Sequence, residues 1–251
     1  LPPPSLPTLQ GLLTPSATLR GKTALVTGGS RGLGALLVQL LALQGCNVYA
    51  CYHQSREAAE GVRQTIADAG GQVVLVSGDI GDVGHCHTLA ERIARVAGGL
   101  GILICNAAPA LQPSWLDPAD AARILAYVTT SVQQVVSPMT ACLALLSKNN
   151  GACAVISSTY VLQPPPHWPH YVAAKMAIEG LVRVAAVQYP DVGFMVPRPP
   201  KMVTDLTNTP LGRVGARAVG PVAAQIVRQI VAGIPKGTVT TLDAFDAETV
   251  S

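Results

Sequence analysis

The sequence predicts an α/β fold in which a doubly wound parallel sheet of about seven strands carries helices on both faces. Short apolar runs bounded by glycine or polar residues recur along the chain, and longer stretches rich in Ala, Leu, Arg and Glu separate them. The runs are continuously apolar, which is typical of parallel strands covered on both sides. Regular succession of strand and helix favours right-handed crossovers between neighbouring strands.

The expected elements follow from these runs in chain order. A late helix is predicted over residues 221–233, because Pro221 stands at the start of an apolar segment and Gly233 near its end. Strands are expected at residues 23–27, 47–52, 72–77, 101–107, 152–158, 192–197 and 237–242.

Length and composition indicate one domain. The 251 residues are 49% hydrophobic and 12% charged, a balance that suits a wide aliphatic core. We assign residues 21–251 to this domain and the proline-rich residues 1–20 to a linker or N-terminal extension. The chain starts at Leu1 and has its first methionine at Met139, so we expect a processed chain or a segment of a longer polypeptide.

Charge and hydropathy exclude two classes of partner. Lys plus Arg exceed Asp plus Glu by 3 (17 against 14), and no basic run is long enough to follow a phosphate backbone. No apolar stretch reaches the roughly 18 residues of a membrane span, and the first residues lack a signal-peptide pattern. We therefore expect a cytoplasmic protein that binds neither nucleic acid nor membrane.

Cysteine and histidine usage gives no sign of a metal or a disulfide framework. The six cysteines have no paired spacing, which favours reduced thiols in the core. His85 and His87 flank Cys86 and suggest a metal ligand set, but no second ligand cluster accompanies them. A polar helix start is the favoured interpretation, and no metal site is expected.

A glycine-rich turn follows the first expected strand. That strand ends at Thr27, then come Gly28, Gly32 and Gly34, and an apolar helix begins at once. Glycine at such places allows a tight turn, and the unpaired amides of the helix start can bind a diphosphate. A plain strand-to-helix turn also favours glycine, so the motif alone is weak.

A second pattern places a phenol above an amine. Tyr171 and Lys175 are four residues apart and share one face of a helix, and Ser158 precedes them at the end of the fifth strand. A free phenol titrates near pH 10, so we expect the Lys175 cation to lower the pKa of Tyr171 and make it a proton donor. Ser158 would then hydrogen-bond a substrate carbonyl. The alternative is a surface tyrosine beside a solvated lysine.

Together these motifs resemble the short-chain dehydrogenase/reductase family, and particularly its ketoacyl-carrier-protein reductase branch. The similarity runs from about Lys22 to Gly215 and implies a Rossmann-like fold, a nicotinamide cofactor and catalysis by Ser158, Tyr171 and Lys175. Thr27 to Gly34 match the family's Thr-Gly-x-x-x-Gly-x-Gly turn, and Asp79 matches the acidic residue that contacts adenine. Asn106 to Ala108 match the Asn-Ala-Gly motif in part, and Tyr171 to Lys175 match the Tyr-x-x-x-Lys pair.

The resemblance also implies a cofactor-binding set. NADPH is favoured over NADH because the end of the second strand carries Cys51, Tyr52 and His53 with no acidic residue, and Arg31 stands in the turn. Arg56 could assist, although a solvated helix start is its simpler role. The expected cofactor contacts are Thr27, Gly28, Ser30, Arg31, Gly32, Leu33, Gly34, Tyr52, His53, Asp79, Ile80, Asn106, Ala107, Tyr171, Lys175 and Thr204.

Three departures from the family pattern stand out. Val128 occupies the place of the relay asparagine, for which Thr129 or Thr130 is a candidate substitute. Pro200 replaces the glycine of a Pro-Gly turn and removes an amide near the nicotinamide. The C-terminal strand that shapes a tetramer interface in relatives is shortened, which leaves a homodimer or contact with neighbouring domains of a larger polypeptide as the expected assemblies.

The resemblance implies NADPH-dependent reduction of a ketone to an alcohol, with a β-ketoacyl or related carrier-bound substrate, as in polyketide or fatty-acid biosynthesis. Free small ketones, or sugar-like or steroid-like alcohols oxidised in reverse, are the other substrates considered. A catalytically impaired nucleotide-binding pseudoenzyme in a multidomain assembly is the alternative function. The loop before Tyr171 either lines the mouth of the site, with Trp168 as an apolar wall and His167 or His170 as a polar edge, or packs its Trp on the domain.

Overall fold

A seven-stranded, all-parallel sheet forms the centre of the protein, with strand order β3-β2-β1-β4-β5-β6-β7. The computed structural model describes residues 8, 11–14, 16–204 and 213–245. The predicted fold class is confirmed, and all seven expected strands are present, six of them with ends shorter by one to three residues than expected. They are β1 (Thr23–Val26), β2 (Asn47–Tyr52), β3 (Val73–Ser77), β4 (Ile102–Cys105), β5 (Ala152–Val155), β6 (Gly193–Pro197) and β7 (Val239–Leu242).

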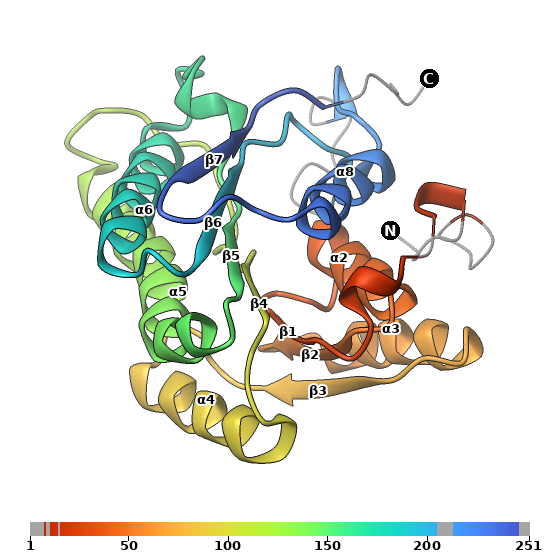
Figure 1. The fold of residues 1–251 in the computed structure, drawn as a ribbon. Coiled ribbons are helices and arrows are strands. Elements are labelled where there is room, and N and C mark those ends of the chain that lie inside the picture. The colour runs from red at the N-terminus through yellow and green to blue at the C-terminus, as the bar shows by residue number, and fades with distance from the viewer. Residues whose placement is uncertain (1–7, 9–10, 15, 205–212, 246–251) are drawn as a thin grey trace.

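Helices cover both faces of the sheet (Figure 1). One face carries α2 (Gly32–Leu43), α3 (Arg56–Asp68) and α8 (Val219–Ala232), and the other carries α4 (Val83–Ala97), α5 (Ala121–Lys148) and α6 (Pro169–Gln188). Two short 3-10 helices, η1 (Ala17–Leu19) and η2 (Thr159–Val161), complete the described elements. The predicted late helix is α8, which begins two residues before the expected start.

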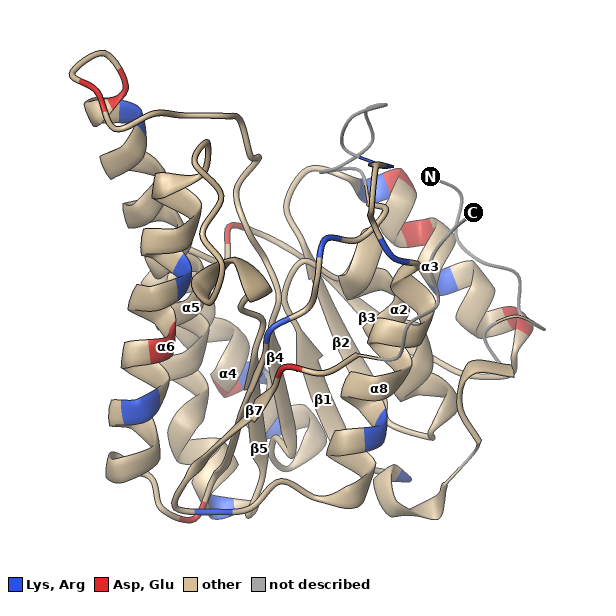
Figure 2. Cartoon of the chain, turned by 90° about the horizontal axis from the view of Figure 1, so that it is seen from above, with Lys and Arg blue, Asp and Glu red and all other residues tan. Residues whose placement is uncertain are grey.

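The pattern of burial explains this layering. Every residue of β1, β4 and β6 is buried, as continuously apolar strands between two helix layers require. Helix α4 instead buries one stripe, Cys86, Leu89, Ala90 and Ile93, at the three-to-four-residue spacing of an amphipathic helix. In Figure 2 the strands are almost wholly uncharged, and Lys, Arg, Asp and Glu lie mainly on helices and connecting segments.

The segment before β1 contacts the domain. Leu19 is buried, and Leu12 and Leu13 pack partly buried against the core cluster on the α2 and α8 side. The backbone N–H of Ser16 donates to the Gln44 side chain at 2.7 Å. The last part of residues 1–20 is therefore in contact with the core, and the division of the chain into an extension and one domain stays a prediction.

The sheet topology fixes where a ligand site can form. Chain order reverses between the neighbouring strands β1 and β4, so their connections leave the sheet in opposite directions and open a crevice at the carboxyl ends of the strands. Thr27, Asn106 and Ser158 follow or lie close to the ends of β1, β4 and β5 at this edge. Among the described residues, none of the helices combines the length and apolarity of a membrane span.

Candidate active site

The glycine-rich turn is packed tightly onto the end of β4. Gly28 has φ +65°, which favours glycine, and a Cβ atom on Gly34 would lie 2.1 Å from the Gly28 carbonyl oxygen. The Asn106 amide donates to the carbonyls of Thr27 and Gly28, both at 3.2 Å. The Thr27 hydroxyl in turn accepts from the N–H groups of Asn106 and Ala107, both at 3.0 Å. These contacts unite the first predicted motif with the Asn106 motif.

The start of α2 offers donors to an anion. Arg31 is the N-cap residue, its side chain is exposed, and it makes no side-chain capping bond, so first-turn N–H groups lack that partner. Gly32 faces Thr204, because a Cβ atom on Gly32 would lie 3.6 Å from the Cγ2 atom of Thr204. Ser30 and Leu33, which are also predicted cofactor contacts, are buried in this turn.

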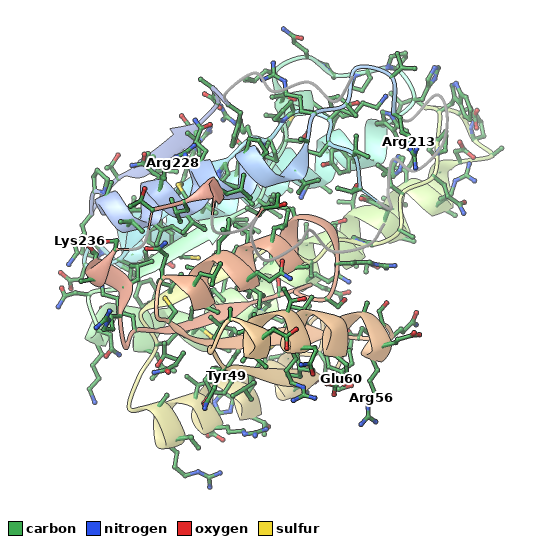
Figure 3. The ribbon with its side chains drawn as sticks, turned by 90° about the vertical axis from the view of Figure 1, so that its right-hand side faces the viewer. Tyr49, Arg56, Glu60, Arg213, Arg228 and Lys236 are labelled. Carbon is green, nitrogen blue, oxygen red and sulfur yellow. The ribbon has the colours of Figure 1, made fainter. Side chains whose placement is uncertain are left out.

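The ends of β2 and β3 complete the same edge. Tyr52 is half-buried as the last residue of β2, and His53 is exposed. The exposed Asp79 accepts from the Gly81 N–H at 2.8 Å, while Ile80 is buried. Arg56 points away from the ribbon in Figure 3, which agrees with a solvated helix start rather than a cofactor contact.

Ser158, Tyr171 and Lys175 come together as predicted. Ser158 is the N-cap of η2, where its hydroxyl accepts from the Tyr160 N–H at 3.2 Å, and its side chain is close enough to Tyr171 to lower the pKa of that phenol. The Lys175 Nζ lies 5.5 Å from the centre of the Tyr171 ring and donates to the Ile156 carbonyl at 2.7 Å. Lys175 is buried, which rules out the alternative of a solvated lysine.

The electrostatics differ from the expectation that Lys175 makes Tyr171 acidic. Burial raises the pKa of Tyr171, hydrogen bonding to Ser158 opposes this rise, and Tyr160 adds to it. Burial also lowers the pKa of Lys175 to about 8, against the effect of Glu179. The expectation was wrong for the protein without ligand, because desolvation outweighs the neighbouring charge. Tyr171 holds its proton at neutral pH, and Lys175 remains largely an ammonium.

The relay position of the family and its two neighbours lie on α5. Val128 is half-buried on α5, Thr129 is exposed, and the Thr130 hydroxyl donates to the Ala126 carbonyl of its own helix at 3.0 Å. Neither threonine therefore has a contact that supports a relay role. The Ser131 hydroxyl, which sequence reasoning did not single out, is buried near the Tyr127 phenol, whose pKa it lowers against the effect of burial.

The loop before Tyr171 is only partly as expected. His170 was predicted at a polar edge, but it is buried, with its ring 4.5 Å from that of Tyr127 in an edge-on contact. His167 is exposed and its ring lies 5.4 Å from Trp115. A hollow of about 250 Å³ lies beside this loop and α5, lined by Ala110, Gln112, Arg123, Ala126, Tyr127, Thr130 and His170.

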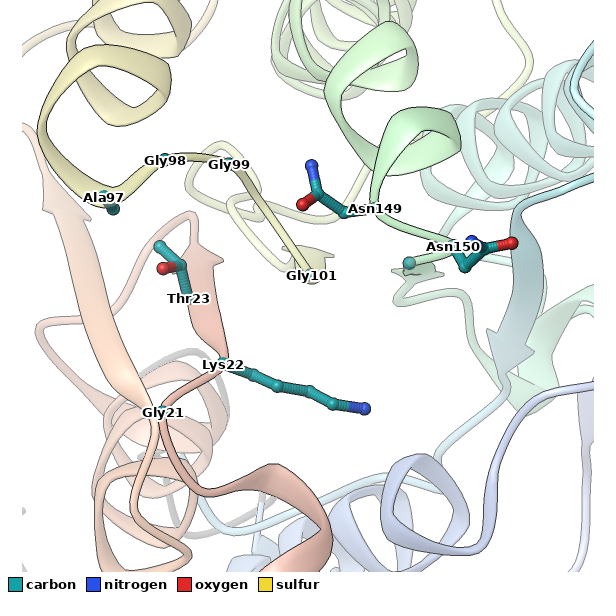
Figure 4. Close-up of a pocket in the computed structure, with 10 residues that line it drawn as sticks. Gly21, Lys22, Thr23, Ala97, Gly98, Gly99, Gly101, Asn149 and Asn150 are labelled. Carbon is teal, nitrogen blue, oxygen red and sulfur yellow. The ribbon is translucent and has the colours of Figure 1, made fainter.

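A second hollow, of about 230 Å³, lies at the opposite, amino end of the strands (Figure 4). Its wall includes Lys22, Asn149 and Asn150, and none of the predicted site residues lines it.

The described residues contain no cluster of metal-ligating side chains, and all six cysteines are buried and free. The candidate chemistry therefore belongs to the carboxyl edge.

Sequence reasoning missed a buried ion pair close to the site. Glu179 on α6 and Arg198 after β6 are 19 residues apart, and the Arg198 Nη2 lies 2.6 Å from Glu179 Oε2. No spacing motif connects two such positions, because only the folded sheet brings the end of β6 against α6.

Comparison with known proteins agrees with this geometry. The chain is 28% identical over 183 residues to 3beta-hydroxysteroid dehydrogenase 1 of Eggerthella lenta, covering 71% of this chain and 69% of the relative. It is 28% identical over 197 residues to a 3-oxoacyl-(acyl-carrier-protein) reductase of Staphylococcus aureus, covering 74% and 77%. A Burkholderia cenocepacia short chain dehydrogenase solved in complex with NADP superimposes with a TM-score of 0.78 at 27% identity, covering 90% of this chain and 98% of that one. The family model described as short chain dehydrogenase matches residues 22–210, and the chain belongs to this family of oxidoreductases.

Proposed function

We propose that this protein is an NADPH-dependent ketoreductase that converts a ketone into an alcohol. The observation that carries the proposal is the meeting of Ser158, Tyr171 and Lys175 at the carboxyl edge of the sheet, next to a glycine turn that leaves helix amides free for a diphosphate. The turn, an acidic residue after β3 and the Asn106 contacts lie on the same edge.

The residues at this edge fit a dinucleotide. The uncapped start of α2 suits the diphosphate, and Gly32 with Thr204 would face the nicotinamide end. The exposed Arg31 and the absence of an acidic residue at positions 51–53 support a ribose phosphate, and hence NADPH rather than NADH. When bound, NADPH would supply the hydride for the carbonyl carbon.

The chain's own residues would manage the proton. Ser158 would donate a hydrogen bond to the substrate carbonyl oxygen, and Tyr171, which keeps its proton because burial raises its pKa, would give that proton to the developing alkoxide. The Lys175 ammonium, anchored to the Ile156 carbonyl, would stabilise the phenolate left behind.

The substrate we propose is a β-ketoacyl or related chain attached to a carrier protein, as in fatty-acid or polyketide biosynthesis, handled in the cytoplasm. The similarity to a 3-oxoacyl-(acyl-carrier-protein) reductase supports this class. The hollow of about 250 Å³ beside His170, the neighbour of Tyr171 in the chain, offers room for such a substrate. A homodimer, or contact with other domains of a longer polypeptide, is the assembly we propose.

The second candidate function is a nucleotide-binding pseudoenzyme with a structural or regulatory role. It is favoured by the half-buried Val128 at the relay position, since valine carries no proton, and by Pro200, which lacks an N–H. The buried Ser158 and Lys175, which both act on the half-buried Tyr171, favour the enzyme.

Turnover measurements with defined substrates distinguish the ketoreductase from the pseudoenzyme. Purified protein is given NADPH or NADH with a 3-oxoacyl group on a carrier protein, the same acyl group on a small thiol, and a free ketone. The enzyme proposal expects NADPH oxidation, fastest with the carrier-bound substrate, and alcohol formed in equal amount. NADPH binding by fluorescence with no alcohol from any of the three substrates would instead identify the pseudoenzyme.

A further inference from the structure

A buried network of hydrogen bonds surrounds Glu179. Its Oε1 accepts from the Ser157 hydroxyl at 2.6 Å and from Arg198 Nε at 2.9 Å, and its Oε2 accepts from Arg198 Nη2 at 2.6 Å. Arg198 Nη1 also reaches Asp243, with 3.1 Å to Oδ1. Glu179 is 6% and Arg198 9% exposed, so this charged pair is largely removed from water.

The network lies close along the chain to the proposed catalytic residues. Ser157 precedes Ser158 in the chain, and Glu179 lies one helical turn after Lys175 on α6, on the face that carries Tyr171. Arg198 follows β6 and Asp243 follows β7, so residues from four neighbouring elements join one network. A carboxylate fixed in this way has a constant position relative to the Lys175 ammonium.

The charge of Glu179 opposes the effect of burial on the pKa of Lys175. Burial by itself raises the pKa of Glu179, but hydrogen bonds from Arg198 and Ser157 outweigh it and leave that pKa below its ordinary value. Glu179 is the charged side chain that acts on Lys175, where it raises the pKa against desolvation. The other titratable groups around the pair are the phenols Tyr127, Tyr160 and Tyr171, the exposed Arg183 at 4.0 Å from Glu179, and Arg198 with Asp243.

We propose that Glu179 is a positioning residue whose carboxylate, held in place by Arg198 and Ser157, keeps the buried Lys175 protonated at neutral pH. The consequence for turnover rests on the proposed ketoreductase function, but the charge of Lys175 does not. Loss of the Glu179 charge leaves the Lys175 ammonium with desolvation unopposed. Lys175 then releases its proton at lower pH and can no longer stabilise a Tyr171 phenolate near neutrality.

The test measures the protonation of Lys175 directly. NMR of protein carrying 13C-labelled lysine, with the Lys175 signal assigned by its loss in Lys175→Met, gives the titration midpoint of Lys175 across pH without substrate or cofactor. Glu179→Gln should lower this midpoint, and a fall of about one unit from the value of about 8 would raise the neutral fraction of Lys175 at pH 7 about fivefold, because a nearby opposite charge favours the ammonium. Glu179→Asp, which keeps the charge but shortens the reach, should stay near the parent midpoint.

Asp243→Asn is the matched control, because it breaks the exposed end of the network and leaves the Glu179 charge in place. It should lower stability without moving the Lys175 midpoint. If Glu179→Gln does not fold, the double variant Glu179→Gln/Arg198→Gln, which buries no unpaired charge, should show the same downward movement. An unchanged Lys175 midpoint in whichever of these two variants folds overturns the proposal. The proposal is also overturned if the loss of Glu179 only lowers the stability of the fold and does not change the charge of Lys175. A moved midpoint in a protein that reduces no ketone would refute only the proposed function.

Discussion

Replacing Lys175 with methionine should change how the free energy of unfolding depends on pH. Burial in the folded protein lowers the pKa of Lys175 from an ordinary 10.5 to about 8. Between these values the unfolded chain binds more protons than the folded protein, so the parent gains stability as pH rises from about 8 to 10.5. Below about pH 8 the cost of burying the ammonium is fully present, and it is about 3 kcal/mol, because each pKa unit corresponds to about 1.4 kcal/mol.

Lys175→Met removes this cost and loses the hydrogen bond to the Ile156 carbonyl, which contributes about 1 kcal/mol. The variant should therefore exceed the parent in unfolding free energy by about 2 kcal/mol at pH 7, and this gain should fall by more than about 2 kcal/mol by pH 10. Urea unfolding followed by tryptophan fluorescence at pH 7, 8, 9 and 10 gives the difference, in which titrating groups common to both proteins cancel. A difference that stays constant with pH refutes the electrostatic reasoning.

Three further predictions concern packing, the cofactor and the thiols. Gly34→Ala forces a methyl group against the Gly28 carbonyl and should lower the unfolding free energy by about 3 kcal/mol or more. The control Gly61→Ala places its methyl group in open space on α3 and should raise the unfolding free energy by about 0.5 to 1 kcal/mol. Urea unfolding midpoints of the two variants give the comparison. Arg31→Ala should weaken NADPH binding by about tenfold or more and leave NADH binding nearly unchanged in fluorescence titrations; an equal loss for both would show that Arg31 does not read the ribose phosphate. The six buried cysteines should resist a thiol reagent at pH 8 and react only after unfolding, and burial also raises the pKa of the Cys86 thiol to about 11; rapid labelling of the native protein would contradict their burial.

Much of the fold and of the candidate site follows from local sequence. Continuous apolar runs mark strands such as β1 and β4, since a strand covered on both faces has no polar side to show. The turn at Gly28 and Gly34 is legible because the atoms that exclude a side chain there belong to the same short segment or to the end of the neighbouring strand. The spacing of Tyr171 and Lys175 is legible because helix geometry alone places them on one face.

What the sequence could not give depends on burial and on contacts distant along the chain. The pKa of Tyr171 moves upward because desolvation dominates, and no spacing reveals how far a phenol is removed from water. His170 looked like part of a polar edge but is covered by Tyr127, which lies more than forty residues earlier on another helix. Glu179 and Arg198 meet only because β6 lies next to β5 and its end reaches α6.

The central claim is that Tyr171 delivers the proton that accompanies hydride transfer, and Tyr171→Phe tests it most directly. Its matched control is Tyr160→Phe, which removes a hydroxyl from the ring that stacks edge-on 6.1 Å from Tyr171. With NADPH and a 3-oxoacyl thioester, kcat should fall by about 100-fold or more for Tyr171→Phe while the Kd for NADPH stays within about twofold, and Tyr160→Phe should stay near the parent. A Tyr171→Phe protein that reduces the thioester within a few fold of the parent rate would contradict the account.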